Sequence, residues 1–317
     1  MTEYFLGVDG GQSSTIAVIG DSQGRILGWA TAGPCNHVAA AEARAKFLGT
    51  MRECVANAGA QAGIDPRDLR FRAACLGMSG GPEDKAALLR EAVAAEHLIV
   101  THDARIALAG AMSGGPGTIV IAGTGSIAYG ENERRESARA GGWGYIFGDE
   151  GGGFDLVRQA LRAILREHEG WGPRTALTPA LLESTETTDA NAALHRFYTP
   201  EWPRSRVAAL ARVVGDIAEE GDPVAVEILH GAAHSLAMLA ASVRRQLWSD
   251  NSVSKGAWVG GVFNSAIVLE RFRTLTELDG TVSAAAPCHG PAVGALLLAW
   301  RAAGVLSVPE PMPGLKA

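Results

Sequence analysis

The sequence predicts an α/β protein made of two similar domains with a cleft between them. A chain of 317 residues is long enough for two domains of ordinary size, each with its own hydrophobic core. A unit of strand, glycine-rich turn and strand also occurs twice, first near the N-terminus and again after residue 117. Helices and further strands follow each copy, and this repetition indicates an internal duplication.

The composition is that of a globular protein, and it excludes several kinds of partner. The formal net charge is -6, and the chain has no run of Lys or Arg, so it lacks the basic surface that nucleic-acid binding requires. No apolar run approaches the roughly 20 residues of a membrane span. The four cysteines are scattered along the chain, which fits reduced thiols better than disulfides. We therefore expect a cytoplasmic protein that binds neither nucleic acid nor membrane, with a homodimer as the default assembly.

The first half of the chain begins with apolar segments that flank polar turns, and this pattern predicts antiparallel strands. An alanine-rich stretch with apolar side chains at helical spacing then predicts a helix. The expected elements are strands at 5–8, 15–19 and 25–31, a helix at 39–59, a strand at 71–78, a helix at 83–96 and a strand at 98–100.

The same plan restarts in the second half. The expected elements are strands at 118–122 and 127–129, helices at 154–167, 204–220 and 223–247, a strand at 258–262 and a helix at 291–303. The glycine-rich segment 112–117 predicts a hinge. We therefore expect a first domain over 1–114 and a second over 115–303, with 304–317 as a candidate helix that joins the first domain.

A polar glycine turn separates the first two expected strands. It consists of Asp9, Gly10, Gly11, Gln12 and Ser13. The backbone N–H groups of such a turn can point at phosphate oxygens, because glycine has no Cβ to block the approach. An ordinary hairpin turn is the alternative. If the turn binds phosphate, Asp9 holds Mg2+ through water, since magnesium keeps much of its hydration shell.

A second glycine turn follows the first strand of the second copy and consists of Gly123, Thr124, Gly125 and Ser126. One such turn is a weak signal by itself. A pair of them, one in each half, predicts that a phosphate chain is held between the halves, where water is excluded. The chain has no Gly-x-x-x-x-Gly-Lys sequence, which disfavours a P-loop kinase.

Asp103 lies between an expected strand and an alanine-rich helix, where open α/β sheets place ligand-binding groups. It suits a general base for a substrate hydroxyl that attacks a γ-phosphoryl group. Capping of the helix is a second use of the same side chain, and the two roles are compatible. We expect the neighbouring His102 to be structural.

Other segments predict contacts with a sugar. Asn36 follows the third strand, where it can bind sugar hydroxyls or form a turn. Trp143 stands between Gly142 and Gly144, and a flat apolar face beside exposed backbone amides suits a sugar ring. Asp149 is expected to bind vicinal hydroxyls, with a helix cap as the alternative.

A glycine pair, Gly260 and Gly261, follows a predicted buried strand at 258–262. Bare backbone at this position would let an adenine and a ribose lie against the chain. A simple turn at the strand end is the alternative.

The order and spacing of these motifs resemble the N-acetylglucosamine kinase group of the BadF/BadG/BcrA/BcrD ATPase family, within the actin-like class of hexokinases and chaperone ATPases. The resemblance covers residues 7–153, 258–265 and 291–298. It implies two ribonuclease-H-like domains with mixed five-stranded sheets flanked by helices. It also implies that Asp103 is the catalytic base and that both glycine turns bind ATP phosphates.

Together these considerations assign the sugar contacts to Asn36, Asp103, Ser126, Gly142, Trp143, Gly144 and Asp149, the ATP contacts to Gly10, Gly11, Gln12, Ser13, Gly123, Thr124, Gly125, Gly260 and Gly261, and Mg2+ to Asp9. The expected reaction is the transfer of the γ-phosphoryl group of ATP to the 6-hydroxyl of an amino sugar, N-acetylglucosamine or, as the alternative, glucosamine.

Two functions of other kinds remain as alternatives. The first is an activator ATPase of a 2-hydroxyacyl-CoA dehydratase or benzoyl-CoA reductase system. Such activators hold an iron–sulfur cluster with cysteines after the second phosphate turn, whereas this chain has no cysteine between Cys75 and Cys288. The second is a sugar sensor without turnover, which Asp103 and the two glycine turns disfavour.

Overall fold

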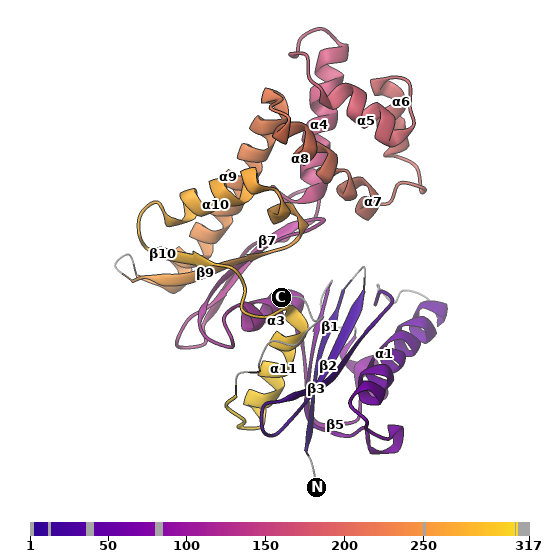
Figure 1. Ribbon diagram of the computed structural model, residues 1–317, viewed down its shortest axis with the longest axis vertical. Helices are drawn as coiled ribbons and strands as arrows, with labels where there is room; N and C mark the ends of the chain where they lie inside the picture. The colour runs from indigo at the N-terminus through magenta and orange to yellow at the C-terminus, as the bar shows by residue number, and fades with distance from the viewer. Residues whose placement is uncertain are drawn as a thin grey trace. The chain divides into compact units, whose positions relative to one another are not determined.

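The computed structural model describes residues 3–11, 14–35, 41–79, 85–249, 252–307 and 309. The chain forms two compact units, Met1–Gly117 together with Ala286–Ala317, and Thr118–Ala285. Each unit contains one five-stranded sheet with helices packed against it (Figure 1). The predicted α/β fold class is therefore confirmed.

The sheet of the first unit has the strand order β3-β2-β1-β4-β5. Its strands are β1 (Tyr4–Gly10), β2 (Thr15–Asp21), β3 (Ile26–Ala32), β4 (Phe71–Met78) and β5 (Ala95–His102). Strands β1 to β3 pair antiparallel, as expected from the hairpin turns. Strands β1, β4 and β5 are parallel, so their carboxyl ends share one edge of the sheet.

Helices cover both faces of this sheet. Those of one face are α1 (Ala41–Gln61) and α2 (Ala86–Ala92), with the short 3-10 helix η1 (Pro66–Asp68) nearby, and those of the other are α3 (Asp103–Ala111) and α11 (Pro291–Ala302). Leu6 and Val8 pack into the core below α1, while Phe5 packs on the α11 side. Because side chains alternate along a strand, β1 is apolar on both faces.

The sheet of the second unit repeats the plan of the first. Its strands are β6 (Gly117–Ala122), β7 (Ser126–Glu131), β8 (Ser137–Gly141), β9 (Ser254–Val259) and β10 (Val282–Ala285). Read from β8, the order is β8-β7-β6-β9-β10, which matches β3-β2-β1-β4-β5 strand for strand. The partners β7 and β8 are antiparallel, and β6, β9 and β10 are parallel. The structure therefore agrees with the internal duplication inferred from the sequence.

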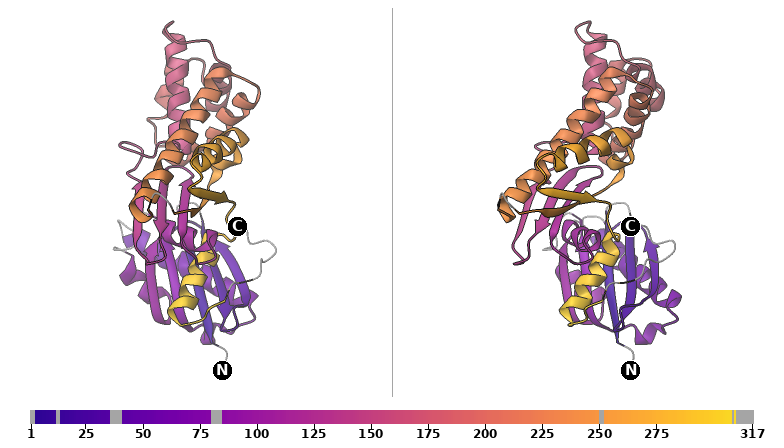
Figure 2. Two further views of the ribbon diagram at one scale, coloured as in Figure 1. Left: turned by 90° about the vertical axis from the view of Figure 1, so that its left-hand side faces the viewer. Right: turned by 60° about the vertical axis from the view of Figure 1, so that its left-hand side comes forward.

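The helices of the second unit form most of its core. They are α4 (Gly153–His168), α5 (Leu177–Thr185), α6 (Ala190–Arg196), α7 (Arg204–Ala209), α8 (Ala211–Glu219), α9 (Pro223–Leu247), α10 (Ala266–Glu277) and the 3-10 helix η2 (Gly261–Asn264). Helix α9 packs on β7, β8 and α10, and Figure 2 shows α9 and α10 side by side. Among the described residues, α9 is the one helix long and apolar enough to cross a membrane. Its apolar positions, such as Leu229 and Leu236, lie in the core of the unit.

The structure corrects the predicted position of the last helix, which the sequence placed in a domain over 115–303. Helix α11 belongs to the first unit, where it packs on α3 and β1. A Cβ atom on Gly294 would lie 2.9 Å from the Cα atom of Gly110, so only glycine permits this close helix contact. The apolar periodicity of 291–303 predicts a helix, but it does not indicate which elements that helix packs against. The expected helix at 304–317 is absent over Gly304–Ser307, and 310–317 lie outside the described residues.

Other element bounds also differ. The helix expected at 83–96 is α2, and the strand β5 starts at Ala95, because this segment pairs with β4 along its whole length. The helix expected at 204–220 is interrupted at Leu210. The strand expected to reach residue 262 ends at Val259, where Gly260 has a φ of 114°.

Candidate active site

The first glycine turn connects β1 and β2 and is anchored by its neighbours. The N–H of Gly11 donates to the carbonyl of Ser14 at 2.9 Å, the N–H of Cys35 donates to the carbonyl of Gly11 at 3.1 Å, and the N–H of Ser79 donates to the carbonyl of Gly10 at 3.1 Å. The ends of β3 and β4 are therefore tied to this turn. Three predicted ligands, Gln12, Ser13 and Asn36, lie outside the described residues.

Two carboxylates lie at the carboxyl edge of the first sheet. Asp9 stands near the end of β1 and Asp103 directly after β5. Burial, and to a lesser extent the negative charge of Asp103, raises the pKa of Asp9 from 3.8 to about 7. Two mutually repelling carboxylates favour a cation beside them.

This carboxylate pair suits Mg2+, which proteins often hold through one or two carboxylates together with water and substrate phosphates. Among the described residues, no group of three or more His, Cys, Asp or Glu side chains gathers around a common point. The sequence-based assignment of Mg2+ to Asp9 through water stays a prediction.

His102 caps helix α3 and orients the start of the helix on which Asp103 lies. Its Nδ1 atom accepts a hydrogen bond from the N–H of Arg105 at 3.2 Å. The N-cap is thus His102 and not Asp103, and the structural role expected for His102 is confirmed. Oδ1 of Asp103 accepts from the N–H of Ala104 at 2.8 Å, and this contact restrains the carboxylate.

The second glycine turn, between β6 and β7, packs against the N-terminus of α4. The N–H of Gly153 donates to the carbonyl of Gly123 at 2.8 Å, and the N–H of Phe154 donates to the carbonyl of Thr124 at 3.0 Å. The hydroxyl of Ser126 donates to the carbonyl of Glu150 at 2.7 Å. Backbone contacts therefore fix the turn, and Ser126 is engaged with the chain itself.

A pocket of about 430 Å³ in the second unit brings together two of the predicted nucleotide motifs. Gly123 and Thr124 of the second glycine turn line it, and so do Gly261 and Val262 after β9. Gly260 lies beneath them, because a Cβ there would be 3.0 Å from the N atom of Gly123. The two motifs are far apart in the sequence, and the parallel pairing of β6 with β9 places them side by side.

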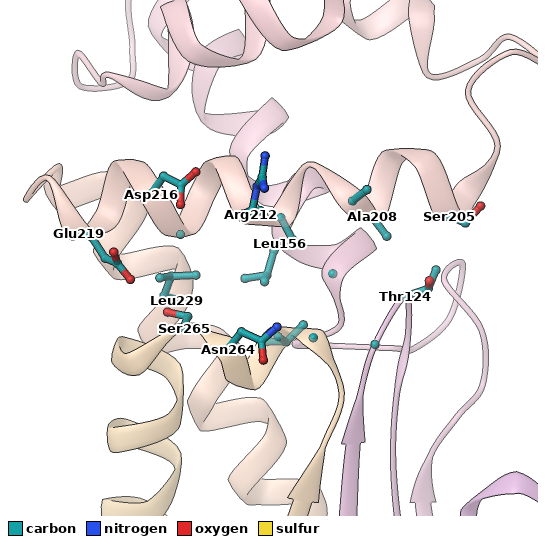
Figure 3. A pocket seen from close by; sticks show the side chains of 17 residues that line it. Thr124, Leu156, Ser205, Ala208, Arg212, Asp216, Glu219, Leu229, Asn264 and Ser265 are labelled. Atoms are coloured by element: carbon teal, nitrogen blue, oxygen red, sulfur yellow. The ribbon is translucent and has the colours of Figure 1, made fainter. Parts of the chain in front are cut away.

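The rest of the pocket wall was not predicted from the sequence. Figure 3 shows Thr124 and Ser205 at one end of the pocket and Asp216 and Glu219, from α8, at the other. Ser265 also lines the pocket, and its buried Oγ atom has no hydrogen-bond partner among the described residues. The acids of α8 have no sequence signal, since polar residues at helical spacing are typical of any solvent-facing helix.

The loop after β8 exposes several large apolar side chains. Trp143 is 66% exposed and Phe147 is 85% exposed. Gly142 and Gly144 have φ values of 71° and 82°, which a residue with a Cβ rarely adopts. The guanidinium carbon of Arg139 lies 4.8 Å from the centroid of the Trp143 ring. The predicted aromatic sugar platform is thus accessible, with a cation near its ring.

Asp149, at the end of the same loop, is buried and paired. It is 5% exposed, and Arg204, at the start of α7, donates from Nη2 to its Oδ2 atom. The sequence predicted Asp149 as a ligand but gave no indication of Arg204, since the pair spans 55 positions of the chain.

Comparisons with known proteins identify relatives over nearly the whole chain. Residues 6–299 match the model of the BadF/BadG/BcrA/BcrD ATPase family. An N-acetylmuramic acid/N-acetylglucosamine kinase of Clostridium acetobutylicum is 32% identical over 283 residues, which cover 87% of this chain and 91% of the relative. An N-acetyl-D-glucosamine kinase of Dictyostelium discoideum is 31% identical over 267 residues, with 78% and 81% covered.

A similar solved structure is also described as a candidate N-acetylglucosamine kinase. The crystal structure of a candidate N-acetylglucosamine kinase from Chromobacterium violaceum superposes with a TM-score of 0.77 and 28% identity, and it covers 93% of this chain and 98% of that one. The family match spans both glycine turns, Asp103 and the glycine pair after β9. The chain belongs to the BadF/BadG/BcrA/BcrD ATPase family.

Proposed function

We propose that this protein is an ATP-dependent kinase that transfers the γ-phosphoryl group of ATP to the 6-hydroxyl of N-acetylglucosamine. One observation carries the nucleotide part of the proposal, namely that Gly123, Thr124, Gly261 and Val262 line a single pocket. Its volume of about 430 Å³ lies within the range of small-molecule sites. The kinase names of two relatives support the reaction.

The residues at the two ends of the pocket suggest the orientation in which ATP binds. Phosphates fit the end with Thr124, where backbone N–H groups of a glycine turn can donate to anionic oxygens. The ribose fits the opposite end, where the carboxylates of Asp216 and Glu219 can accept from its hydroxyls (Figure 3). Ser265 offers a hydroxyl without a partner, which suits a hydrogen bond to the base.

Asp103 acts as the general base in this proposal. It takes the proton of the sugar 6-hydroxyl, the oxygen attacks the γ-phosphorus atom, and the bond to the β-phosphate oxygen breaks to release ADP. Asp9 holds Mg2+ through water, and the metal neutralises charge on the phosphates when it is bound. Gly10, Gly11, Gln12 and Ser13 contact the phosphates from the first glycine turn.

The sugar is held by Asn36, Ser126, Trp143 with its flanking glycines, and Asp149. The exposed ring of Trp143 supports this assignment, because a flat apolar surface packs well on a pyranose ring. The hydroxyl of Ser126 is already hydrogen-bonded to Glu150, so it serves the sugar as an acceptor. The N-acetylmuramic acid named for one relative differs at the C3 substituent, and we place N-acetylglucosamine first because both relatives' names include it.

The activator ATPase is not favoured. The second unit, Thr118–Ala285, contains no cysteine, and the four cysteines of the chain are Cys35, Cys54, Cys75 and Cys288. A cluster that requires thiolates after the second glycine turn has no ligands there.

The test is a coupled ADP-release assay with ATP and Mg2+ and a panel of N-acetylglucosamine, N-acetylmuramic acid, glucosamine, N-acetylmannosamine and glucose. A no-sugar control runs beside it, and phosphorus NMR of the product locates the phosphate. We expect N-acetylglucosamine to stimulate ADP release most, with a 6-phosphate as product. Hydrolysis that no sugar changes, or no ADP release at all, would overturn the proposal.

We further expect a cytoplasmic enzyme, because ATP is made and spent in that compartment, and a homodimer, the commonest assembly of soluble enzymes. Sedimentation velocity at micromolar concentration tests the second expectation.

A further inference from the structure

Arg204 covers a carboxylate that the proposed reaction needs. Its guanidinium donates from Nη2 to Oδ2 of Asp149, and the side chain of Asp149 is 7% exposed while that of Arg204 is 32% exposed. The guanidinium carbon also lies 5.2 Å from the centroid of the Tyr145 ring. The guanidinium therefore occupies Oδ2 of Asp149, and a sugar hydroxyl can take the place of Arg204 at this oxygen only when the guanidinium moves.

The same guanidinium lies against the second glycine turn. A Cβ atom built on Gly125 would be 2.6 Å from Nη2 of Arg204, and the next residue, Ser205, lines the nucleotide pocket beside Gly123 and Thr124. The Nε atom of Arg204 is buried and has no hydrogen-bond partner among the described residues. An arginine with an unused donor at a phosphate-binding turn is suited to a phosphate group, two oxygens of which can accept a bidentate pair.

We propose that Arg204 is a positioning residue that couples nucleotide binding to sugar binding. When ATP occupies the pocket, the guanidinium transfers from Asp149 to a phosphate oxygen beside Gly125. Asp149 is then uncovered, and sugar hydroxyls replace the lost donor. This coupling rests on the proposed function, because it takes the turn as a phosphate site and Asp149 as a sugar ligand.

The cost of leaving a buried carboxylate without a partner makes the coupling positive, so that each ligand favours the binding of the other. A buried carboxylate that loses its partner is unfavourable, so the exchange is favourable only when phosphate receives the arginine and a sugar receives the carboxylate. Each ligand therefore removes part of the cost of binding the other. By linkage, the nucleotide raises the affinity for the sugar by the same factor by which the sugar raises the affinity for the nucleotide.

The experiment measures the dissociation constant of N-acetylglucosamine by calorimetry, with and without the non-hydrolysable analogue AMPPNP and Mg2+. In the wild-type chain we expect AMPPNP to tighten sugar binding by at least about fivefold. In Arg204→Gln we expect the two constants to differ by less than about twofold, because Asp149 is no longer covered by a cation that only phosphate removes. Sugar binding without nucleotide should be as tight as in wild type or tighter.

Arg206→Gln is the matched control. Arg206 lies on the same helix, stacks on Trp202 and donates to the carbonyl of Glu201, away from the pocket lining. We expect it to keep the wild-type coupling. If Arg204→Gln fails to fold, Arg204→Lys replaces it, since lysine keeps the charge but loses the planar fork, and we expect a smaller coupling than in wild type.

Three outcomes separate the inference from the proposed function. A wild-type chain that phosphorylates no amino sugar overturns the proposed function and the coupling with it. An active wild-type chain with no coupling overturns the coupling alone. An active chain whose coupling survives unchanged in Arg204→Gln, or in Arg204→Lys where the first variant does not fold, removes Arg204 from the role.

Discussion

Asp103 is the residue on which the proposed transfer depends most directly. It lies in the first turn of α3, and its Oδ1 atom accepts from the N–H of Ala104, a hydrogen bond that the amide oxygen of an asparagine can also accept. We expect Asp103→Asn to lower kcat by about 10²- to 10⁴-fold, the usual contribution of a general base, while the dissociation constant of the sugar changes little. The coupled assay measures the first quantity and calorimetry the second.

Asp68→Asn is the control for this experiment, since Asp68 is exposed on η1 and the substitution is chemically identical. It should retain the wild-type rate. A rate for Asp103→Asn within about tenfold of wild type would remove Asp103 as the base.

Asp9 makes the stability of the chain depend on pH. Its pKa is raised from 3.8 to about 7 in the folded chain, first by burial and then by Asp103. The folded chain therefore holds a proton that the unfolded chain loses, and the free energy of unfolding falls as the pH rises from about 4 to about 7. Asp9→Asn lacks this dependence, so we expect it to gain stability relative to wild type across that window.

Urea denaturation in EDTA at about pH 5 and about pH 8 measures the effect. EDTA keeps divalent cations from lowering the pKa of Asp9. If the difference in unfolding free energy between Asp9→Asn and wild type is the same at the two pH values, Asp9 titrates normally in the folded chain.

At the scale of elements, backbone hydrogen bonds join the second glycine turn to the start of helix α4. A Cβ on Gly152 would lie 2.7 Å from the Cα atom of Gly125, and Gly152 has a φ of -75°, so any effect of a side chain comes from this contact. We expect Gly152→Ala to cost about 1–3 kcal/mol of unfolding free energy and to weaken ATP binding, because the turn must shift. Urea denaturation and nucleotide titration measure the two effects.

Gly231→Ala provides the comparison. Gly231 lies on the exposed side of α9, where a Cβ meets nothing within 4 Å. This change should stabilise the chain by roughly 0.5–1 kcal/mol through helix propensity. Wild-type ATP affinity in Gly152→Ala would mean that the turn does not hold the phosphates.

Elements with local signals could be predicted from the sequence. The strands β1 to β4 and the two glycine turns were predicted correctly because their signals, apolar segments and glycine clusters, lie within the elements themselves. The unit to which α11 belongs was misplaced, since it depends on the contact of Gly294 with Gly110. The pairing of Arg204 with Asp149 could not be predicted either, since the local sequence around each residue carries no information about a partner 55 positions away.

At the scale of the whole molecule, the two units differ in their cysteines. All four belong to the first unit. Cys35 and Cys54 lie in the core on the α1 side of its sheet and Cys75 in the core on the other side, whereas Cys288 is exposed. Thiol reactivity therefore reports on the first unit alone.

We expect one thiol to react rapidly with Ellman's reagent in the native chain and three more only on unfolding. Burial raises the pKa of Cys35, of Cys54 to about 11 and of Cys75 to about 12, so these thiols are neither ionised nor accessible near neutral pH. Because the cores on both faces share one sheet, the three should appear together as urea opens the first unit. Cys288→Ser should abolish the rapid phase. If a thiol still reacts rapidly in that variant, one of the buried cysteines is accessible, which would show that the first unit opens locally without unfolding.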